Sequence, residues 1–258
     1  MELKILAIGD VCGETGVRFL TKKLWSLRSF YGADMVVVNG ENAAVFGINP
    51  ALARELRDAG ADVITLGNHS FDRREILTYL DDEEHIIRPA NWSSVLPGVG
   101  VCYYDTPQAE VCVINLIGRV CMDVGPESPF DAIDRILEKV EKRTKFIVVD
   151  FHAEATSEKI AMGYHLDGRA SVLFGTHTHV QTADERIFAK GLGYITDLGM
   201  TGAINSVLGV APEQSLASLR GDKLVRMQDA GGPAMICGAV FTLDGSGRCT
   251  NVERIRIE

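Results

Sequence analysis

The chain has 258 residues, enough to bury a substantial core in one α/β domain or two small ones. Its 46% apolar and 24% charged residues are typical of a globular protein that is soluble in water. With 26 basic and 35 acidic residues the net charge is −9, so no long nucleic acid is expected as a partner, because polyanion binding needs a basic surface. A small phosphorylated substrate stays compatible with this charge, because a bound cation reverses the local field.

Targeting and membrane signals are not apparent in the sequence. The first residues form a strand-like segment, Leu3–Ile8, without the pattern of a signal peptide, and no apolar run approaches the ~20 residues of a membrane span. The six cysteines form no C-x-x-C pair and lie in apolar runs, which is typical of reduced, mostly buried thiols. We therefore expect a cytoplasmic protein with no membrane partner. Both a monomer and a homo-oligomer stay open.

The first third of the chain alternates between short apolar segments and longer amphipathic ones, the pattern of parallel strands joined by helices. Pro50 suits the first turn of a helix, and Gly60 suits its C-terminal end. We expect, in chain order, a strand to Gly9, a helix over 16–30, a strand over 35–39, a helix over 50–59, a strand over 62–66 and a helix over 72–80.

The remainder is richer in strands. Short strands with Pro and Gly turns are expected over 86–116. They are followed by a helix over 129–142, strands over 146–150, 172–175, 186–187 and 193–195, a Gly-rich loop over 201–209, a helix over 212–219, and strands over 234–243 and 252–257. No repeat or linker marks a boundary, so residues 1–258 are expected to form a single domain. An α/β start followed by a strand-rich half predicts two packed sheets with helices outside.

Five of the apolar segments end beside residues that can bind a metal ion. These are Asp10; Glu41 and Asn42; Asn68 and His69; Asp150 and His152; and His177 and His179. Open α/β sheets bind their ligands beyond the carboxyl ends of the strands. A single acid at such a position is more often a helix cap, and a single histidine is more often part of a core, which is the interpretation given to His85 and His165. Five coincident strand ends predict a metal site assembled from distant segments.

The donor atoms of these residues indicate the kind of ion. Carboxylates, imidazoles and the amides of Asn42 and Asn68 suit Mn²⁺, Fe²⁺ or Zn²⁺ rather than a soft thiolate site. Seven donors are too many for one tetrahedral ion. They suit two ions about 3.5–4 Å apart, bridged by a carboxylate and a solvent molecule.

The spacing of the residues suggests individual roles. His177 and His179 are two residues apart, so in extended backbone both rings project to the same side, and each can serve one ion. Glu41, directly after a buried strand, is well placed to be the bridge. If Asn68 faces a metal, the adjacent His69 is free to act as a general acid on the substrate. Asp150 is also a candidate ligand, but it still alternates with its strand, so His152 is preferred.

Together these motifs resemble the calcineurin-like metallophosphoesterases. The resemblance rests on Gly9-Asp10, Gly67-Asn68-His69, Asp150-Phe151-His152 and the segment GTHTH at 175–179. Two positions depart from the usual pattern: Cys12 stands in place of a histidine, and Glu41 in place of the bridging aspartate. Both departures match one branch, the bacterial YmdB-type proteins, and the similarity to that branch extends over almost the whole chain.

The resemblance implies a four-layer αββα sandwich and a phosphodiesterase that acts on 2′,3′-cyclic nucleotides with a di-iron or di-manganese centre. It implies that metal-bridged hydroxide attacks phosphorus while His69 donates a proton to the leaving ribose oxygen. Cys12 as a thiolate ligand is less favoured, because the branch does not need it. The implied ligands are Asp10, Glu41, Asn42 and His179 for the first ion, and Glu41, Asn68, His152 and His177 for the second.

Two other functions compete with this prediction. A phosphomonoesterase or nucleotidase can use the same centre, because the metals recognise phosphate more than its substituent. A regulatory binding protein with stabilising metals is the alternative from another class. It is disfavoured because a structural metal site needs neither an open position nor a proton donor such as His69.

Overall fold

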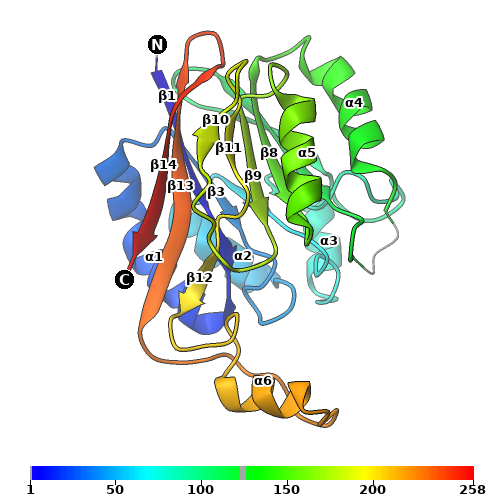
Figure 1. The fold of residues 1–258 in the computed structure, drawn as a ribbon, viewed down its shortest axis with the longest axis vertical. Coiled ribbons are helices and arrows are strands. Elements are labelled where there is room, and N and C mark those ends of the chain that lie inside the picture. Colours follow the sequence, from blue (N-terminus) through cyan, green and yellow to red (C-terminus); the bar gives the residue numbers. More distant parts are fainter. Residues whose placement is uncertain (1, 123–125) are drawn as a thin grey trace.

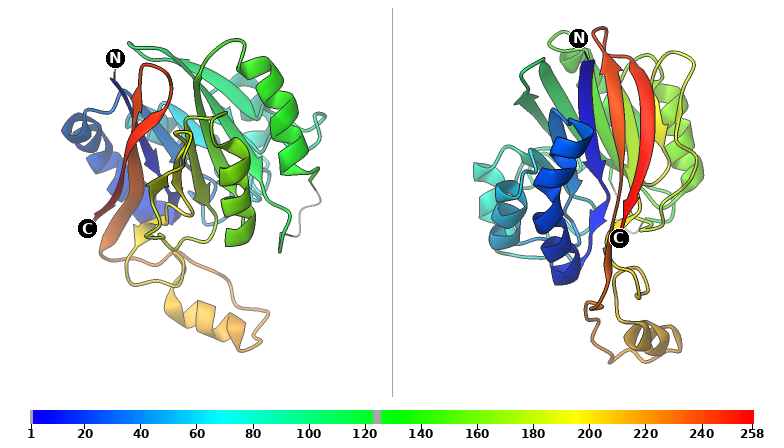
Figure 2. Two further views of the ribbon diagram at one scale, coloured as in Figure 1. Left: turned by 45° about the horizontal axis from the view of Figure 1, so that its top comes forward. Right: turned by 90° about the vertical axis from the view of Figure 1, so that its left-hand side faces the viewer.

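The computed structural model describes residues 2–122 and 126–258. Two β-sheets pack face to face, and helices cover their outer faces (Figure 1). In the right-hand view of Figure 2 the blue helices lie on one side of the strands and the green helices on the opposite side. The predicted four-layer αββα sandwich with two mixed sheets is confirmed. None of the helices in the described ranges has the length and apolar character that crossing a membrane requires.

The first sheet joins the N-terminal strands to the C-terminal ones. Its order is β2-β12-β13-β1-β3-β4-β5, with β14 also paired to β13. Strands β1, β3, β4 and β5 run parallel, and β13 runs antiparallel to β1. The bounds are β1 Glu2–Ile8, β2 Asp10–Val11, β3 Met35–Asn39, β4 Val63–Thr65, β5 Ile86–Ile87, β12 Met200–Ala203, β13 Ala234–Asp244 and β14 Cys249–Ile257.

The second sheet is formed by the middle of the chain, in the order β10-β11-β9-β8-β7-β6. Strands β7, β8, β9 and β11 run parallel, while β6 and β10 are antiparallel edge strands. The bounds are β6 Val101–Asp105, β7 Glu110–Ile117, β8 Phe146–His152, β9 Val172–Thr176, β10 Arg186–Ile187 and β11 Gly193–Ile195.

Two of the helices, α2 and α4, begin at residues whose side chains cap the first turn. Asn49 accepts a hydrogen bond from the Leu52 N–H, and Ser128 accepts one from the Asp131 N–H; each is followed by a proline in the first helical turn. Helix α6 projects beyond the sheets at the lower end of the molecule in Figure 1. The bounds are α1 Gly13–Tyr31, α2 Pro50–Asp58, α3 Ile76–Asp82, α4 Pro129–Val140, α5 Thr156–Leu166 and α6 Pro212–Leu219.

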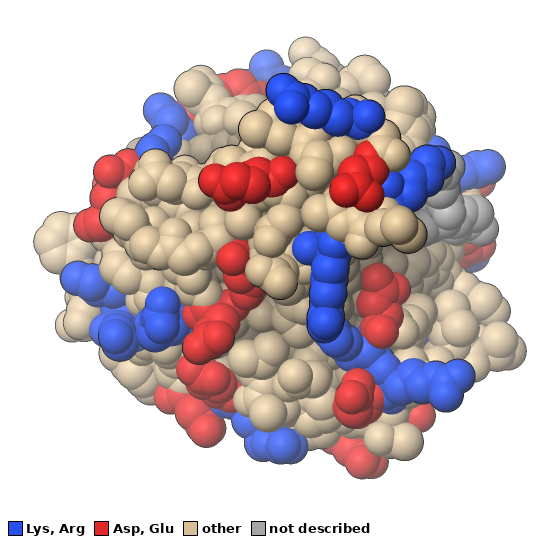
Figure 3. All heavy atoms as spheres, turned by 90° about the horizontal axis from the view of Figure 1, so that it is seen from below, with Lys and Arg blue, Asp and Glu red and all other residues tan. Residues whose placement is uncertain are grey.

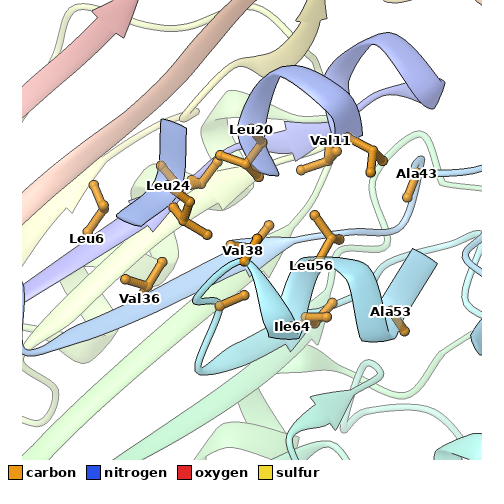
Figure 4. Close-up of a cluster of buried hydrophobic side chains, with 14 of the residues drawn as sticks. Leu6, Val11, Leu20, Leu24, Val36, Val38, Ala43, Ala53, Leu56 and Ile64 are labelled. Atoms are coloured by element: carbon orange, nitrogen blue, oxygen red, sulfur yellow. The ribbon is translucent and has the colours of Figure 1, made fainter. Parts of the chain in front are cut away.

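Strand alternation divides the core into three apolar clusters, one for each interface between layers. In β1, Leu6 and Ile8 contact the cluster under α1 and α2, whereas Leu3 and Ile5 face the second sheet. Figure 4 shows the outer cluster, in which Leu20 and Leu24 of α1 pack over the first sheet beside Leu56 of α2. A third cluster lies between the second sheet and helices α4 and α5.

The same alternation positions polar residues at the ends of the strands. In β8, Phe146 and Val148 belong to the cluster between the sheets, and Ile147 and Val149 to the cluster under the helices. Because side chains alternate along a strand, Asp150 and His152 fall on the face between the sheets. Three other strands also end in a polar side chain on the face between the sheets: Asn39 of β3, Thr65 of β4 and Thr176 of β9. The apolar core between the sheets therefore ends in polar side chains.

Most predicted elements are confirmed, with differences at their ends. Strand β8 continues to His152, and α1 begins at Gly13 rather than 16. Helix α3 begins at Ile76 rather than 72, because residues 72–75 form a turn. Strand β12 overlaps the start of the predicted Gly-rich loop and pairs with β2 and with β13 through only two residue pairs each. So short a strand is formed by a tertiary contact between distant segments, and no local sequence pattern indicates it.

The cysteines agree with the predicted reduced state. All six are free; five are buried, and Cys121 is exposed.

Candidate metal centre

The carboxyl ends of the parallel strands lie at one end of the molecule, the lower end in Figure 1. Acidic and basic side chains are interspersed on that face (Figure 3). The structure brings all the predicted metal-site side chains together there, in two groups that Glu41 connects. The first group is Asp10, Asn42 and His179; the second is Glu41, Asn68, His152 and His177.

The second group converges on one atom, Nε2 of the fully buried His152. This nitrogen lies 2.9 Å from Oε1 of Glu41, 2.9 Å from Oδ1 of Asn68 and 3.0 Å from Nδ1 of His177. A single N–H can satisfy only one of these three acceptors. Glu41, His152 and His177 also form a cluster whose ligand atoms all lie within 4.8 Å of one another. Such an arrangement favours a cation at its centre.

The other nitrogen of His152 is held by a chain of hydrogen bonds. The Thr176 hydroxyl donates to Oδ1 of Asp150 at 2.8 Å, so its oxygen accepts the proton on Nδ1 of His152, also at 2.8 Å. Oδ2 of Asp150 accepts further bonds from Thr65 and Asn39. Burial raises the pKa of Asp150 to about 6 in spite of these bonds. Asp150 therefore supports a candidate ligand instead of acting as one, and Nε2 of His152 is directed toward the cation position.

His177 presents the opposite nitrogen. Its Nε2 lies 3.1 Å from Oε2 of Glu154, a carboxylate that accepts the proton there and leaves the Nδ1 lone pair facing His152. Burial and the positive charge of His152 lower the pKa of His177 to about 3. A neutral imidazole is the form that binds a metal.

The first group contains a buried oxygen without a partner. Oδ1 of Asp10 is fully buried and accepts no hydrogen bond from residues 2–122 or 126–258, and it lies 3.7 Å from Nε2 of His179. Nδ1 of His179 donates to the Leu208 carbonyl at 3.0 Å, which leaves Nε2 free. The Asn42 amide lies 3.1 Å from that Nε2, and rotating the amide by 180° turns its oxygen toward the same point. An orphaned carboxylate oxygen, an imidazole nitrogen and an amide oxygen suit a borderline divalent ion.

Glu41 lies between the groups with both oxygens in use. Oε1 faces His152 and, before the Asn42 amide is rotated, accepts from its nitrogen at 3.2 Å, a bond that rotation gives up; Oε2 accepts the His69 backbone N–H at 3.2 Å. Burial alone would raise the pKa of Glu41, but His152 and His69 outweigh it and lower the pKa to about 2. A Cβ at Gly67 would lie 2.2 Å from Oε2 of Glu41, so only glycine fits beside this carboxylate.

The backbone of the histidine pair differs from the prediction. His177 has φ 99° and His179 has φ 63°, so neither residue is extended, and the argument from i, i+2 spacing in a strand was wrong. The rings nevertheless face different groups, because each left-handed residue turns the chain after β9. Such conformations are costly for residues with a side chain and persist only where the surroundings enforce them.

Cys12 lies beside the His179 ring, nearer to Nδ1 than to Nε2, from which its Sγ is 4.0 Å away. Its Sγ is 3.5 Å from Nδ1 of His179, the nitrogen that bonds to Leu208, and 3.4 Å from the Asp10 carbonyl oxygen. Burial raises the pKa of the Cys12 thiol. Both observations favour a neutral thiol beside the site over a thiolate ligand.

His69 faces a cavity of about 450 Å³ that both groups also line. Its Nδ1 lies 2.7 Å from Oδ2 of Asp72, which leaves Nε2 available toward the cavity. The ring of Phe46 packs against the His69 ring at 5.0 Å between centroids. Leu219 of α6 forms part of the opposite wall. The volume is in the range of small-molecule sites.

Sequence reasoning missed the residues that orient the candidate ligands. Asp72 is three residues after His69 in a turn, Glu154 is two residues after His152, and Thr176 directly precedes His177. The proximity of Asp72 and Glu154 to predicted site residues is the only local signal, and it is weak. Each partnership depends on how the turns fold.

Comparisons with known proteins identify the family of this chain. The family model described as YmdB-like protein matches residues 6–255. The 2′,3′-cyclic-nucleotide 2′-phosphodiesterase of Bacillus subtilis (strain 168) is 41% identical over 257 residues, 99% of this chain and 97% of that protein. The crystal structure of a hypothetical protein from Thermus thermophilus superposes on this chain with a TM-score of 0.93 and 37% sequence identity, and the match covers 99% of each chain. A structure described as a novel phosphatase from Mycoplasma pneumoniae has TM-score 0.92 and 33% identity, covering 100% of this chain and 94% of the other. This chain belongs to the YmdB-like family.

Proposed function

We propose that this protein is a metal-dependent phosphodiesterase that hydrolyses 2′,3′-cyclic nucleotides. The observation that carries the proposal is the placement of His69, a proton donor held by Asp72, at the same cavity as the two groups of metal-binding side chains. The substrate class comes from the Bacillus subtilis relative, which is similar along nearly the full length of both chains. We also propose that residues 1–258 act as a single domain, since both halves contribute to the core between the sheets.

We propose that the centre holds two ions, iron or manganese. The first would be held by Asp10, Glu41, Asn42 and His179, and the second by Glu41, Asn68, His152 and His177. The unpartnered Oδ1 of Asp10 and the crowding of acceptors around His152 support this assignment. When bound, such ions supply Lewis-acid polarisation of the phosphoryl group and lower the pKa of water.

The protein's own residues would then handle the proton and the leaving group. Asp72 accepts the Nδ1 proton of His69 and fixes the ring, so that Nε2 can donate a proton to the departing ribose oxygen. Glu154 and Thr176 hold the two neighbouring imidazoles in orientations that leave their ligand nitrogens free. The relative's name specifies the 2′ bond, whose cleavage leaves the phosphate on the 3′ oxygen.

Hydrolysis of 2′,3′-cyclic AMP by protein loaded with Mn²⁺, followed by ³¹P NMR, tests the proposal. We expect a single new resonance of 3′-AMP with wild type, and a strongly reduced rate with His69→Ala. A protein that binds Mn²⁺ but leaves 2′,3′-cyclic AMP intact would contradict the proposal. Formation of 2′-AMP would keep the phosphodiesterase and correct the bond.

A phosphomonoesterase is the second candidate, and the description of the Mycoplasma pneumoniae structure as a phosphatase favours it. Parallel assays with 3′-AMP and 5′-AMP distinguish the two activities, because a phosphomonoesterase releases inorganic phosphate from these monoesters. A regulatory binding protein would turn over neither class of substrate.

A further inference from the structure

A buried ion pair lies directly behind the strained histidine segment. Lys159 of α5 and Asp197, which follows β11, have side chains only 1% exposed, and Nζ lies 2.7 Å from Oδ2. Neither residue is among the candidate ligands. Burying two charges is costly, and an apolar pair of similar volume is often equally stable. This pair therefore requires an explanation other than stability.

The pair binds the segment on both sides of His177. Nζ of Lys159 donates to the Thr176 carbonyl oxygen at 2.8 Å. Oδ2 of Asp197 accepts the Thr178 backbone N–H at 3.2 Å and the Thr178 hydroxyl at 2.8 Å. Oδ1 of Asp197 accepts the Gly199 N–H at 2.8 Å, which fixes the carboxylate in place.

The Lys159 side chain packs closely against the strand that leads into this segment. At Gly175 a Cβ would lie 1.9 Å from the Thr196 carbonyl oxygen and 2.8 Å from Cδ of Lys159, so the lysine stem packs directly on the backbone of β9. His177 and His179 both have positive φ, and Thr178 stands between them. Because such backbone relaxes unless it is held, the bonds to Thr176 and Thr178 oppose relaxation, together with the bond that the His177 N–H donates to Oδ2 of Asp10 at 3.2 Å.

We propose that Lys159 and Asp197 are positioning residues that hold His177 and His179 in their left-handed conformations and so present one ring to each ion. The proposal rests on the two-ion centre proposed above. It requires that weakening the pair lowers metal affinity at both positions together, since the two rings face different groups.

Mn²⁺ titration by calorimetry of the metal-free protein tests this without any substrate. In Lys159→Met/Asp197→Leu the net charge of the pair stays zero, so the long-range field on the ions changes little. We expect Mn²⁺ affinity to fall about tenfold or more in both binding steps, as for other residues that orient ligands. Lys159→Met/Asp197→Asn keeps an oxygen acceptor for Thr178 and is expected to lose less. Affinity within about twofold of wild type in the leucine variant would overturn the proposal.

A matched control separates positioning from general loss of stability. Leu137→Ala opens a cavity in the cluster under α4, remote from the histidine segment, and should leave Mn²⁺ affinity unchanged while it lowers the melting temperature. Equal loss of Mn²⁺ affinity in Leu137→Ala would refute a specific role of the ion pair.

A milder pair of variants keeps the test decisive if the double variants do not fold. Thr178→Val removes the hydroxyl donor to Asp197, and Thr178→Ser retains it. We expect weaker Mn²⁺ binding and faster exchange of the residue-178 amide proton in the valine variant only. Identical behaviour of the two variants would refute the proposal. If the wild-type protein binds Mn²⁺ but does not hydrolyse 2′,3′-cyclic AMP, the proposed function alone would be refuted.

Discussion

Replacing His69 with alanine should remove proton donation and leave the metal site intact. The His69 side chain makes one hydrogen bond, to Asp72, and packs against Phe46. The contact with Glu41 comes from the His69 backbone N–H, which alanine retains. Asp72 is 46% exposed, so loss of the pair is expected to cost no more than about 1 kcal/mol of folding stability. Metal content and melting temperature should therefore stay close to those of wild type.

The catalytic loss should be much larger than the stability loss. A general acid contributes roughly 10²–10⁴-fold, about 3–5 kcal/mol of barrier, so kcat on 2′,3′-cyclic AMP should fall by that factor in His69→Ala. A ribose oxygen needs the proton because its conjugate acid is weak. A nitrophenolate scarcely needs it, so the loss on bis-p-nitrophenyl phosphate should be clearly smaller.

Steady-state kinetics on both substrates, with metal analysis of the same preparations, provides the measurement. Asp72→Asn is a graded control, since its amide oxygen can still accept the Nδ1 proton of His69, and it should lose less activity than His69→Ala. Equal losses of His69→Ala on the two substrates, or the loss of one metal equivalent, would refute the reasoning and assign His69 to substrate orientation or metal binding. If kcat changes little on either substrate, His69 has only a packing role.

Three further variants test the centre. Glu41→Gln removes the negative charge between the two groups and should abolish hydrolysis with the fold intact by circular dichroism; an active variant with two metal equivalents would exclude the bridge. Cys12→Ser should keep two metal equivalents and most activity, because Sγ lies closer to the His179 nitrogen that bonds to a carbonyl than to Nε2. One missing equivalent would make the thiolate a ligand. Glu154→Ala removes the acceptor for Nε2 of His177 and should weaken Mn²⁺ binding, measured by calorimetry, by about tenfold. Glu154→Gln keeps an acceptor and should weaken Mn²⁺ binding less. Equal Mn²⁺ affinities of the two variants would show that Glu154 does not orient His177.

The layers of the fold and most of the residues that meet at the site can be read from the order of segments along the chain. Strand periodicity is a local property, and parallel strands bring their carboxyl ends to one edge, so the positions of Asp10, Glu41, Asn68 and His152 followed from the order of apolar segments. The alternation that divides β1 and β8 between two clusters is equally readable in the chain.

The orientation of each candidate ligand depends on contacts between distant segments and cannot be read from the sequence. The nitrogen that each histidine presents depends on a partner from another segment, such as Thr176 for His152 and the Leu208 carbonyl for His179. The left-handed backbone at His177 likewise has no local cause, since positive φ is uncommon for residues that carry a side chain. It is held by Asp197, which follows β11 and accepts two hydrogen bonds from Thr178, and by Oδ2 of Asp10, which accepts the His177 N–H. Hydrogen bonds between residues far apart in sequence leave no periodic pattern, and so they become visible only when the fold is known.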